Sequence, residues 1–489
     1  MNGTLPIDRW VISGTLTTLA PLAIRTGLTE TIMRPNDPQL TLEKALIALD
    51  YQGRPYLTAT AIKGMVRAIA VARLDDTSKG AIRRLFGDLP RSETKPGSDD
   101  PATKQAQGGS AEFRDAFTAA AEPVLDRGQT RIDRKHGTAE DKLLRQGQFA
   151  AAGIGFAVEI VLDRVEESDV KLLCGLLAAL DGSGPHSQMG GAGGASIQAE
   201  NWSVRRWGKT EIEAWLAKDV NLPWQDCGAA VEATAWFTAP LDPAEITTIA
   251  LTLAINGHFL VSRVNPKKTD PTLTDNQKQE QPNLIPASRT NQVADRAWLP
   301  KSALKGALRS QAERICRTLG ITGTDWHDTP VEVLFGSSNR AGLLKCGDIT
   351  GDNAQPVTLD MVAIDRLSGS AADGAKFAIL AWEAPVLSGN LQLVRKRQVN
   401  HALSGKPGSG QPPEVEAPAI GLLALVLRDL GEGDVSLGYG ARKGFGQVRP
   451  DGWDWRAALD LLGENDEVSA CITEFRTWAK AQQTEGAAA

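Results

Sequence analysis

An internal repeat constrains the fold of this chain more than any other feature of its sequence. Four landmarks occur twice, in the same order, at separations of 242, 249, 232 and 248 residues. Self-similarity of this kind indicates a duplicated structural unit. The sequence therefore predicts two tandem domains, 1–240 and 241–489. The four pairs of landmarks are LTATAIKGMVRAIA (57–70) with LPKSALKGALRSQA (299–312), RRLFGD (83–88) with EVLFGS (332–337), RIDRKHGTAEDK (131–142) with AIDRLSGSAADG (363–374), and LLAALDGSGPHSQMGGAGG (176–194) with LALVLRDLGEGDVSLGYGARKG (423–444).

The length of the chain agrees with two domains. Its 489 residues are about two to three times the length of a typical domain. A hydrophobic share of 42% with 23% charged residues is ordinary for a globular protein with a proper core. Polar, Pro/Gly-rich stretches at about 91–110 and 396–418 are expected to be loop insertions, one in each domain. The segment at about 454–483 is expected to form one or two amphipathic helices.

Each half is predicted to be an α+β domain. The expected order of strand, helix, strands, helix, Gly-rich turn and strand suits a ferredoxin-like sheet, which is also the scaffold of RRM-type RNA binders. The stretch around Lys63 is predicted to be helical because its apolar residues follow the i, i+3, i+4, i+7 rule (Ile62, Met65, Val66 and Ile69).

Both predicted helices carry two cations one turn apart. They are Lys63 with Arg67 in the first half, and Lys305 with Arg309 in the second. A helix start with outward cations and a small glycine is a natural seat for a phosphate group. We therefore expect these four side chains to contact an anion.

The segment LGYGARKGFG at 437–446 combines four glycines with two cations. The glycines permit positive φ and a close approach of backbone amides to an anion, and the cations add charge. A tight chain connection is the alternative reading, since one Gly-rich motif is weak support for binding. The equivalent MGGAGGASIQ of the first half lacks the cations, so an anion contact there should be weaker. The residues concerned are Gly438, Gly440, Arg442, Lys443, Gly444 and Gly446.

Composition argues against several classes of function. A net charge of -6 and a pI near 5.6 are unlike those of a typical basic nucleic-acid binder, although a binding groove is a local feature. No apolar run approaches the roughly 20 residues of a membrane span, so we predict a cytoplasmic protein without membrane contact. The five cysteines and five histidines are scattered without a C-x-x-C pair, so neither a tightly bound metal nor an organic cofactor is expected.

The motifs LPKSALKGALR, LFG, AIDRLSGSAADGAKF and LGYGARKGFGQV, in this order, resemble the RAMP superfamily of CRISPR-associated proteins. They are most similar to the Csm/Cmr-type backbone subunits of type III effector complexes and cover nearly all of the second half. The first half departs more from the pattern. A fused pair resembles the double backbone subunits of type III-D-like effectors. This resemblance implies two tandem ferredoxin-like domains with Gly-rich loops and β-hairpin thumb insertions.

The resemblance also implies RNA ligands and protein partners. The Gly-rich loop would hold the backbone of the guide RNA (crRNA), read by shape rather than by sequence. Arg134 and Arg366, in the segments that match the family's thumb hairpins, would contact RNA, whereas Asp133 and Asp365 are read as holding local turns or ion pairs. Expected partners are crRNA, target RNA, a large polymerase-like subunit and further RAMP subunits.

Backbone subunits of this family often cleave target RNA with one loop aspartate and a divalent ion. The corresponding loops here offer Asp37 and Glu43 in the first half, and Asp270 and Asp275 in the second. A carboxylate there would orient Mg²⁺ or Mn²⁺, or accept a proton. Each of these acids also fits a plain solvated loop carboxylate.

Two other functions remain open. The chain is alternatively a non-catalytic architectural subunit, whose RNA contacts come from its neighbours. A guide-processing endoribonuclease of the same superfamily is the weaker alternative, because it usually needs a histidine near the N-terminus and the first one here is His136.

Overall fold

The computed structural model divides into two compact units, whose described parts lie within 8–237 and 246–488. The predicted insertions at 91–110 and 396–418 fall mostly outside the described residues. In the described part of the chain, no helix combines the length and apolar character needed to cross a membrane. The structure describes residues 8–34, 37–74, 78–87, 108–119, 124–133, 138–182, 188–189, 195–217, 228–237, 246–268, 270–290, 294–321, 329–337, 341–352, 354–394 and 416–488.

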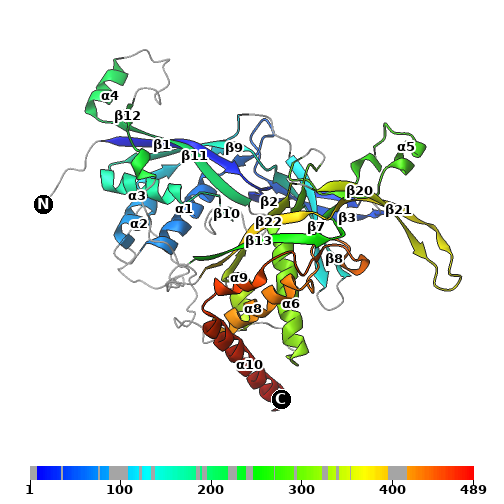
Figure 1. The fold of residues 1–489 in the computed structure, drawn as a ribbon. Helices are drawn as coiled ribbons and strands as arrows, with labels where there is room; N and C mark the ends of the chain where they lie inside the picture. The colour runs from blue at the N-terminus through cyan, green and yellow to red at the C-terminus, as the bar shows by residue number, and fades with distance from the viewer. Residues whose placement is uncertain are drawn as a thin grey trace, which may run out of the picture. The chain divides into compact units, whose positions relative to one another are not determined.

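The first unit is built on an eight-stranded sheet, and helices α1, α2 and α3 are gathered on one side of it (Figure 1). Its central strand β1 pairs antiparallel with both β9 and β11. The order is β10-β11-β1-β9-β6-β4, with β12 on β11 and β5 on β9. The strands are β1 (Arg9–Thr18), β4 (Tyr56–Leu57), β5 (Ala111–Phe113), β6 (Ala116–Phe117), β9 (Gly155–Asp163), β10 (Gln188–Met189), β11 (Ala195–Trp207) and β12 (Ala229–Val231), and the helices are α1 (Ala59–Arg73), α2 (Lys79–Phe86), α3 (Glu167–Ala178) and α4 (Lys209–Leu216).

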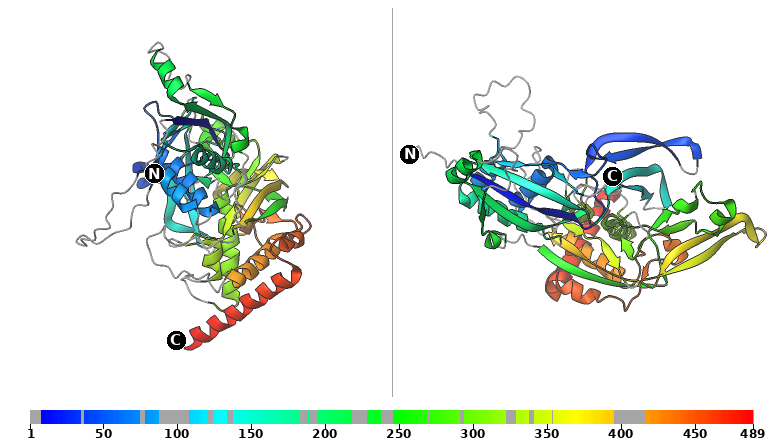
Figure 2. Two further views of the ribbon diagram at one scale, coloured as in Figure 1. Left: turned by 90° about the vertical axis from the view of Figure 1, so that its left-hand side faces the viewer. Right: turned by 90° about the horizontal axis from the view of Figure 1, so that it is seen from above.

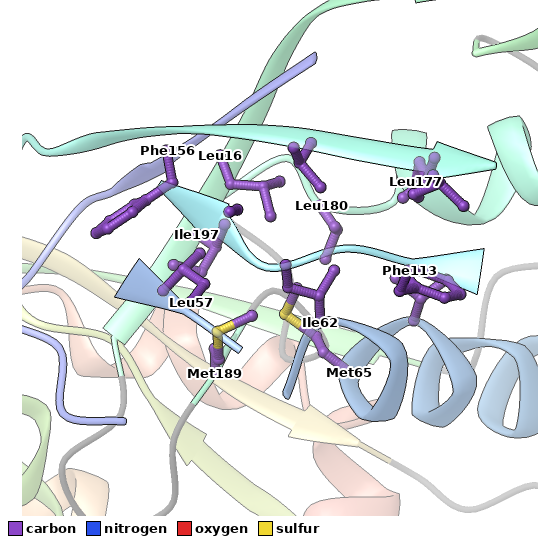
Figure 3. Packing of buried hydrophobic residues seen from close by; sticks show 14 of the residues in the cluster. Leu16, Leu57, Ile62, Met65, Phe113, Phe156, Leu177, Leu180, Met189 and Ile197 are labelled. Carbon is purple, nitrogen blue, oxygen red and sulfur yellow. The ribbon is translucent and has the colours of Figure 1, made fainter. Parts of the chain in front are cut away.

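The core of the first unit lies between this sheet and helices α1 and α3. The predicted helical stripe is buried as expected, since Ile62, Val66 and Ile69 are fully inaccessible. Figure 3 shows Ile62 and Met65 of α1 facing side chains of the sheet, among them Leu57 and Phe113. Burial of such side chains is the main favourable term in folding.

Two hairpins of the first unit form a separate four-stranded sheet. They are β2 (Arg25–Arg34) with β3 (Asp37–Ile47), and β7 (Val124–Asp133) with β8 (Thr138–Ala150). The sheet order is β2-β3-β8-β7, and β3 runs parallel to β8. The segment that was expected to be an acid-bearing loop therefore contains the paired strands β2 and β3, with Arg34 opposite Asp37.

The second unit repeats the arrangement of the first around strand β13. Strand β13 pairs antiparallel with β22 and β23, and Figure 1 shows α6, α8 and α9 together on one side of β13 and β22. The elements are β13 (Ile246–Asn256), β17 (Ala297–Leu299), β18 (Leu344–Cys346), β19 (Ile349–Gly351), β22 (Val386–Val394) and β23 (Gln447–Val448), with α6 (Lys301–Thr318), α7 (Pro330–Phe335), α8 (Glu416–Gly431), α9 (Trp455–Asp460) and α10 (Asn465–Ala488).

A second sheet of this unit contains a long hairpin, β20 (Gln355–Ile364) with β21 (Ala371–Glu383). Figure 2 shows the hairpin, in yellow, reaching well beyond the other strands of its sheet. The short strands β14 (His258–Phe259), β15 (Ser262–Val264) and β16 (Leu284–Pro286) complete this sheet, and α5 (Asp275–Glu280) lies between β15 and β16 in the chain.

The two units thus share one α+β plan, and the predicted fold class is confirmed. In each, a first strand lies between two antiparallel neighbours, helices cover one face, and a long hairpin carries the IDR landmark. The predicted C-terminal helices correspond to α9 and α10.

Candidate nucleic-acid interface

The starts of α1 and α6 are occupied by carboxylates of the chain itself. Asp115 accepts a hydrogen bond from the backbone amide of Ala59 (2.7 Å), and Asp348 accepts one from the amide of Lys301 (2.8 Å). Asp348 also accepts from the Trp298 indole at 2.9 Å. A carboxylate at a helix start satisfies one of its unpaired amides and the positive end of the helix dipole. An external phosphate near these helices would therefore depend on side-chain cations.

The two predicted arginines bind inside their own units. Arg67 donates to the carbonyl of Gly87 at 3.2 Å, and Arg309 donates to the carbonyl of Gly336 at 2.9 Å. These glycines belong to the two LFG landmarks, so the same hydrogen bond joins the same two landmarks in both units. Arg309 additionally forms an ion pair with the buried Glu313 at 3.0 Å. Part of the donor capacity of each arginine is thus used internally.

The predicted lysines of these helices are partly buried. Burial lowers the pKa of Lys63, and the nearby charge of Arg67 lowers it further. Burial likewise lowers the pKa of Lys305, with added repulsion from Lys345 and Arg309.

Two lysines that the sequence did not single out accompany Lys305. Lys301 is the first residue of α6, one turn before Lys305, and Lys345 lies on β18, against which α6 packs. The only sequence signal for Lys301 was its place at the start of the helix landmark. Lys345 stands 40 residues after Lys305, and only the tertiary structure brings it close.

The Gly-rich loop at 437–446 is a tight turn in which all four glycines adopt positive φ, between +70° and +85°. A Cβ on Gly446 would lie 1.7 Å from the carbonyl oxygen of Leu437, and one on Gly438 would lie 2.5 Å from that of Leu260. The amides of Leu437, Tyr439, Lys443, Gly444, Phe445 and Gly446 donate to carbonyls of the chain itself. The glycines therefore allow the loop to pack closely against backbone carbonyls. Many of its backbone amides already donate hydrogen bonds within the chain.

The loop is anchored on the base of the β20–β21 hairpin. Phe445 is buried in a small cluster with Leu260, Ile379 and Ala381. The ammonium of Lys443 lies 4.8 Å from the ring centre of Phe377, on β21, and donates to the Tyr439 hydroxyl at 3.3 Å. Packing of this kind brings the predicted cation-bearing loop and the predicted thumb hairpin into one site.

The tip of the β20–β21 hairpin is exposed. Asp365 closes its turn by accepting a hydrogen bond from the amide of Leu367 at 2.8 Å, as expected for a turn-holding carboxylate. Arg366 is exposed beside it, and the side chain of Leu367 is 100% exposed. The corresponding Arg134 lies outside the described residues.

The four candidate carboxylates occupy different settings. Glu43 is exposed on β3, opposite Thr31. Asp37 begins the same strand, and its side chain is outside the described set. Asp270 accepts hydrogen bonds from the amide and hydroxyl of Thr272 (2.8 and 2.6 Å), and these bonds lower the pKa of the carboxyl group. Asp275 is exposed in the first turn of α5.

Divalent ions in proteins commonly take part of their ligands from the bound substrate. The described side chains contain no cluster of three or more His, Cys, Asp or Glu residues with the arrangement of a metal site. Mg²⁺ commonly binds through one or two carboxylates together with substrate phosphates and water. A single acid such as Glu43 or Asp275 fits that manner of binding, and RNA phosphates would supply further ligands.

Comparison with known proteins identifies one family. The model of the RAMP superfamily matches residues 15–196 and 280–449, one region in each unit. The matched regions contain helices α1 and α6, both LFG landmarks and the hairpins β7–β8 and β20–β21. No curated protein matches the chain.

Proposed function

Since this chain belongs to the RAMP superfamily of CRISPR-associated RNA-binding proteins, we propose that it is a backbone subunit of an RNA-guided antiviral effector. It would be a Csm/Cmr-type subunit of a type III complex with two fused RAMP domains. It would bind crRNA and target RNA in the cytoplasm, together with further RAMP subunits and a large polymerase-like subunit.

The packing of the Gly-rich loop on the β20–β21 hairpin supports this proposal most directly. The loop presents the exposed Arg442 and Lys443, and the hairpin presents Arg366 at its tip. Phe445 packs the loop against the hairpin base, so the loop and the hairpin belong to one site. A site with several cations suits a ligand whose charges recur along a backbone.

The side chains of this site have separate tasks in the proposed function. Arg442 would place its guanidinium against RNA phosphates, for which a planar donor fork is well suited. Lys443, held over Phe377 and Tyr439, would contribute a positioned charge with little loss of conformational freedom on binding. Arg366 and Leu367 at the hairpin tip would meet the RNA where guide and target strands separate.

Charge reversal of the loop tests RNA binding. The double variant Arg442→Glu, Lys443→Glu should bind guide RNA more weakly and with a shallower dependence on salt, because phosphate contacts release counterions. The control is Arg476→Glu, Lys480→Glu on α10, which changes the net charge equally. Equal RNA affinity of the assembled complex with the loop variant and with wild type would refute RNA contact by this loop.

Cleavage of target RNA by a loop carboxylate is the finer part of the proposal. Bound Mg²⁺ or Mn²⁺ would stabilise charge on the phosphodiester undergoing scission. The protein's own part would be to hold the carboxylate of Asp37, Glu43, Asp270 or Asp275 near the 2′-hydroxyl. We expect Asp37→Asn, Glu43→Gln, Asp270→Asn or Asp275→Asn to abolish one cut in a complex with crRNA, target RNA and either ion.

A non-catalytic architectural subunit is the second candidate. Two observations favour it: the carboxylate of Asp270 is engaged by Thr272, and the chain is acidic overall, with a net charge of -6. Unchanged target cleavage in all four carboxylate variants, or none by the wild-type complex, would favour this candidate over the nuclease.

A further inference from the structure

The two hairpins of the first unit meet over a short stretch of backbone, which we call the hairpin junction. Strand β3 runs parallel to β8, and the described ladder between them contains two residue pairs, Lys44 with Gln146 and Ala45 with Gly147. Strands β2 and β3 pair over much of their length, as do β7 and β8. Backbone pairing therefore holds each hairpin together more firmly than it holds one hairpin to the other.

The side chain of Arg25, on β2, crosses the hairpin junction. Its Nη1 atom donates to the carbonyl of Ala45 on β3 at 2.8 Å and to the carbonyl of Gln148 on β8 at 3.1 Å. The guanidinium carbon lies 4.9 Å from the ring centre of Phe149, which is buried on β8. A cation at this distance from an aromatic ring is attracted to it. One side chain thus connects three strands of the sheet.

The space for this guanidinium is provided by Gly147. A Cβ at this position would lie 2.6 Å from Nη2 and 2.7 Å from Nη1 of Arg25. The φ angle of Gly147 is not positive, so its backbone conformation is open to other residues. The lack of a side chain is therefore what allows Arg25 to lie against β8.

The second unit has an equivalent junction without an arginine. Strand β16 runs parallel to β21 through the pair of Leu284 with Ile379. In both units the amide three residues further along, that of Ala48 or Ala287, donates to the residue just before the first strand of the hairpin. The two junctions therefore correspond, and Ile379 occupies the place of Gly147.

The two junctions are held by different chemistry. Ile379 is fully buried in the cluster that contains Leu260 and Phe445 of the Gly-rich loop. Apolar packing thus joins the hairpin to its neighbours in the second unit, whereas the guanidinium of Arg25 occupies the corresponding place in the first. An unbranched cation and a glycine in one copy replace a buried isoleucine in the other.

The hairpin junction lies close to the candidate acids of the first unit. Glu43 directly precedes the pair of Lys44 with Gln146, and Asp37 begins the same strand. Eight residues of extended strand separate Asp37 from Ala45, a distance of about 26 Å. A small change of angle at the junction would move these carboxylates relative to the β7–β8 hairpin. A misplacement of about 1 Å at a reacting group can cost about 100-fold in rate.

We propose that Arg25 is a positioning residue for cleavage of target RNA: it holds the acid-bearing β2–β3 hairpin to the β7–β8 hairpin. The acid of the first unit is thereby kept in place beside the RNA that the β7–β8 hairpin contacts. This inference rests on the proposed function and deepens it, because cleavage by the first unit then depends on a side chain that acts through the sheet. Cleavage by the second unit does not depend on Arg25.

Substitutions on both sides of the contact test this role in the assembled complex with crRNA, target RNA and Mg²⁺. Arg25→Met removes the charge and the donors but keeps an unbranched side chain. Gly147→Ala displaces the guanidinium without changing any charge, and Arg25→Lys keeps the charge and a donor. The matched control is Gly80→Ala on α2, where the new Cβ would make an ordinary contact with Arg84 at 3.7 Å.

The cut made by the first unit is the one that Asp37→Asn or Glu43→Gln abolishes. We expect its single-turnover rate to fall about 10- to 100-fold in Arg25→Met and in Gly147→Ala, because the acid is misplaced. The other cut and the affinity for target RNA should keep their wild-type values. Arg25→Lys should recover part of the rate. The double variant Arg25→Met, Gly147→Ala should be no slower than either single variant, because both remove one contact.

Hydrogen exchange resolved by peptide gives a readout that does not depend on cleavage. In Arg25→Met the amides of 44–47 and 146–149 should exchange faster than in the wild type, whereas those of 9–18 on β1 should keep their protection. Unchanged exchange at the hairpin junction would overturn the inference.

The cleavage assay separates failure of the inference from failure of the proposed function. If Arg25→Met makes the first-unit cut at the wild-type rate, Arg25 has no positioning role and the proposed function stands. If Arg25→Met weakens RNA binding or slows both cuts equally, the residue acts in binding or folding instead. If neither Asp37→Asn nor Glu43→Gln removes a cut that the wild type makes, the hairpin carries no cleaving acid and the inference falls alone. If the wild-type complex cleaves nothing, the inference and the proposed nuclease fall together.

Discussion

At the scale of single residues, two cationic side chains one helix turn apart have different roles. Lys305 and Arg309 were both expected to contact an anion. In the structure Arg309 bridges the Gly336 carbonyl and the carboxylate of Glu313, whereas Lys305 has no such acid partner among the described residues. Sequence spacing places both cations on one helix, but it does not reveal which of them finds a partner inside the fold.

Removal of the Arg309 side chain should therefore destabilise the second unit. Arg309→Ala leaves the buried carboxylate of Glu313 with only Arg317 and leaves the Gly336 carbonyl without this donor. We expect the free energy of unfolding to fall by about 2–3 kcal/mol. Arg314→Ala, at an exposed position of the same helix, should change it little. Denaturant unfolding measures both, and equal stabilities of the two variants would contradict the bracing role of Arg309.

The lysine cluster should make stability depend on alkaline pH. Burial holds the pKa values of Lys301, Lys305 and Lys345 below the ordinary 10.5, so between those values the unfolded chain binds more protons. The free energy of unfolding should then rise with pH across this window. The other charged side chains facing the cluster are Arg309 and Asp348, and burial raises the pKa of the neighbouring Cys346 thiol to about 12.

The variant Lys345→Gln should show a smaller rise in the free energy of unfolding between neutral and alkaline pH. Urea unfolding of wild type and Lys345→Gln at a series of pH values up to 10.5 measures the difference. A steeper rise in the variant than in the wild type would mean that the three ammonium groups do not share one desolvated environment.

At the scale of elements, the Gly-rich loop precedes strand β23 and packs against the base of the β20–β21 hairpin. Its positive φ values place Phe445 into the cluster with Leu260 and Ile379. The sequence predicted the need for backbone freedom in this loop. The reason for it, close approach to the Leu437 and Leu260 carbonyls, depends on contacts that only the folded sheet supplies.

Alanine substitutions distinguish two reasons for glycine in this loop: the left-handed backbone conformation and the lack of space for a Cβ. Gly444→Ala should cost about 1–2 kcal/mol, because only the left-handed backbone opposes it and no atom lies within 4 Å of the new Cβ. Gly446→Ala should cost clearly more, since its Cβ would meet the Leu437 carbonyl oxygen at 1.7 Å. Thermal unfolding compares the two variants. Equal losses would show that backbone conformation alone selects glycine here.

The hairpins show where element assignment from sequence failed. The segment 25–47 was expected to be a loop because it corresponds to the acid-bearing loop of the family, yet it contains β2 and β3. The alternation of LTETIM and the RPND turn were the available signals. Pairing of β3 with β8 cannot be read from that segment, because its partner lies about 100 residues later. The acids Asp37 and Glu43 consequently lie on a strand.

At the scale of the whole molecule, duplication produced two units with separate cores. Ile12 of β1 and Leu253 of β13 are each fully buried, in different clusters. We expect Ile12→Ala and Leu253→Ala to lower the stability of their own unit by about 2–5 kcal/mol. Hydrogen exchange resolved by peptide should speed up mainly in the unit that carries the substitution. Equal acceleration in both units would mean that they unfold as one cooperative body.

The sequence by itself determined the duplication, the α+β class and the position of the Gly-rich turn. These features depend on local periodicity and on repeated motifs, which can be recognised in the sequence without knowledge of tertiary contacts. Only the tertiary structure decided that Arg309 is bound inside its own unit and that Lys345 comes near Lys301 and Lys305. The physical reason is that ion pairing and desolvation depend on distances between residues far apart in sequence, and folding alone sets those distances.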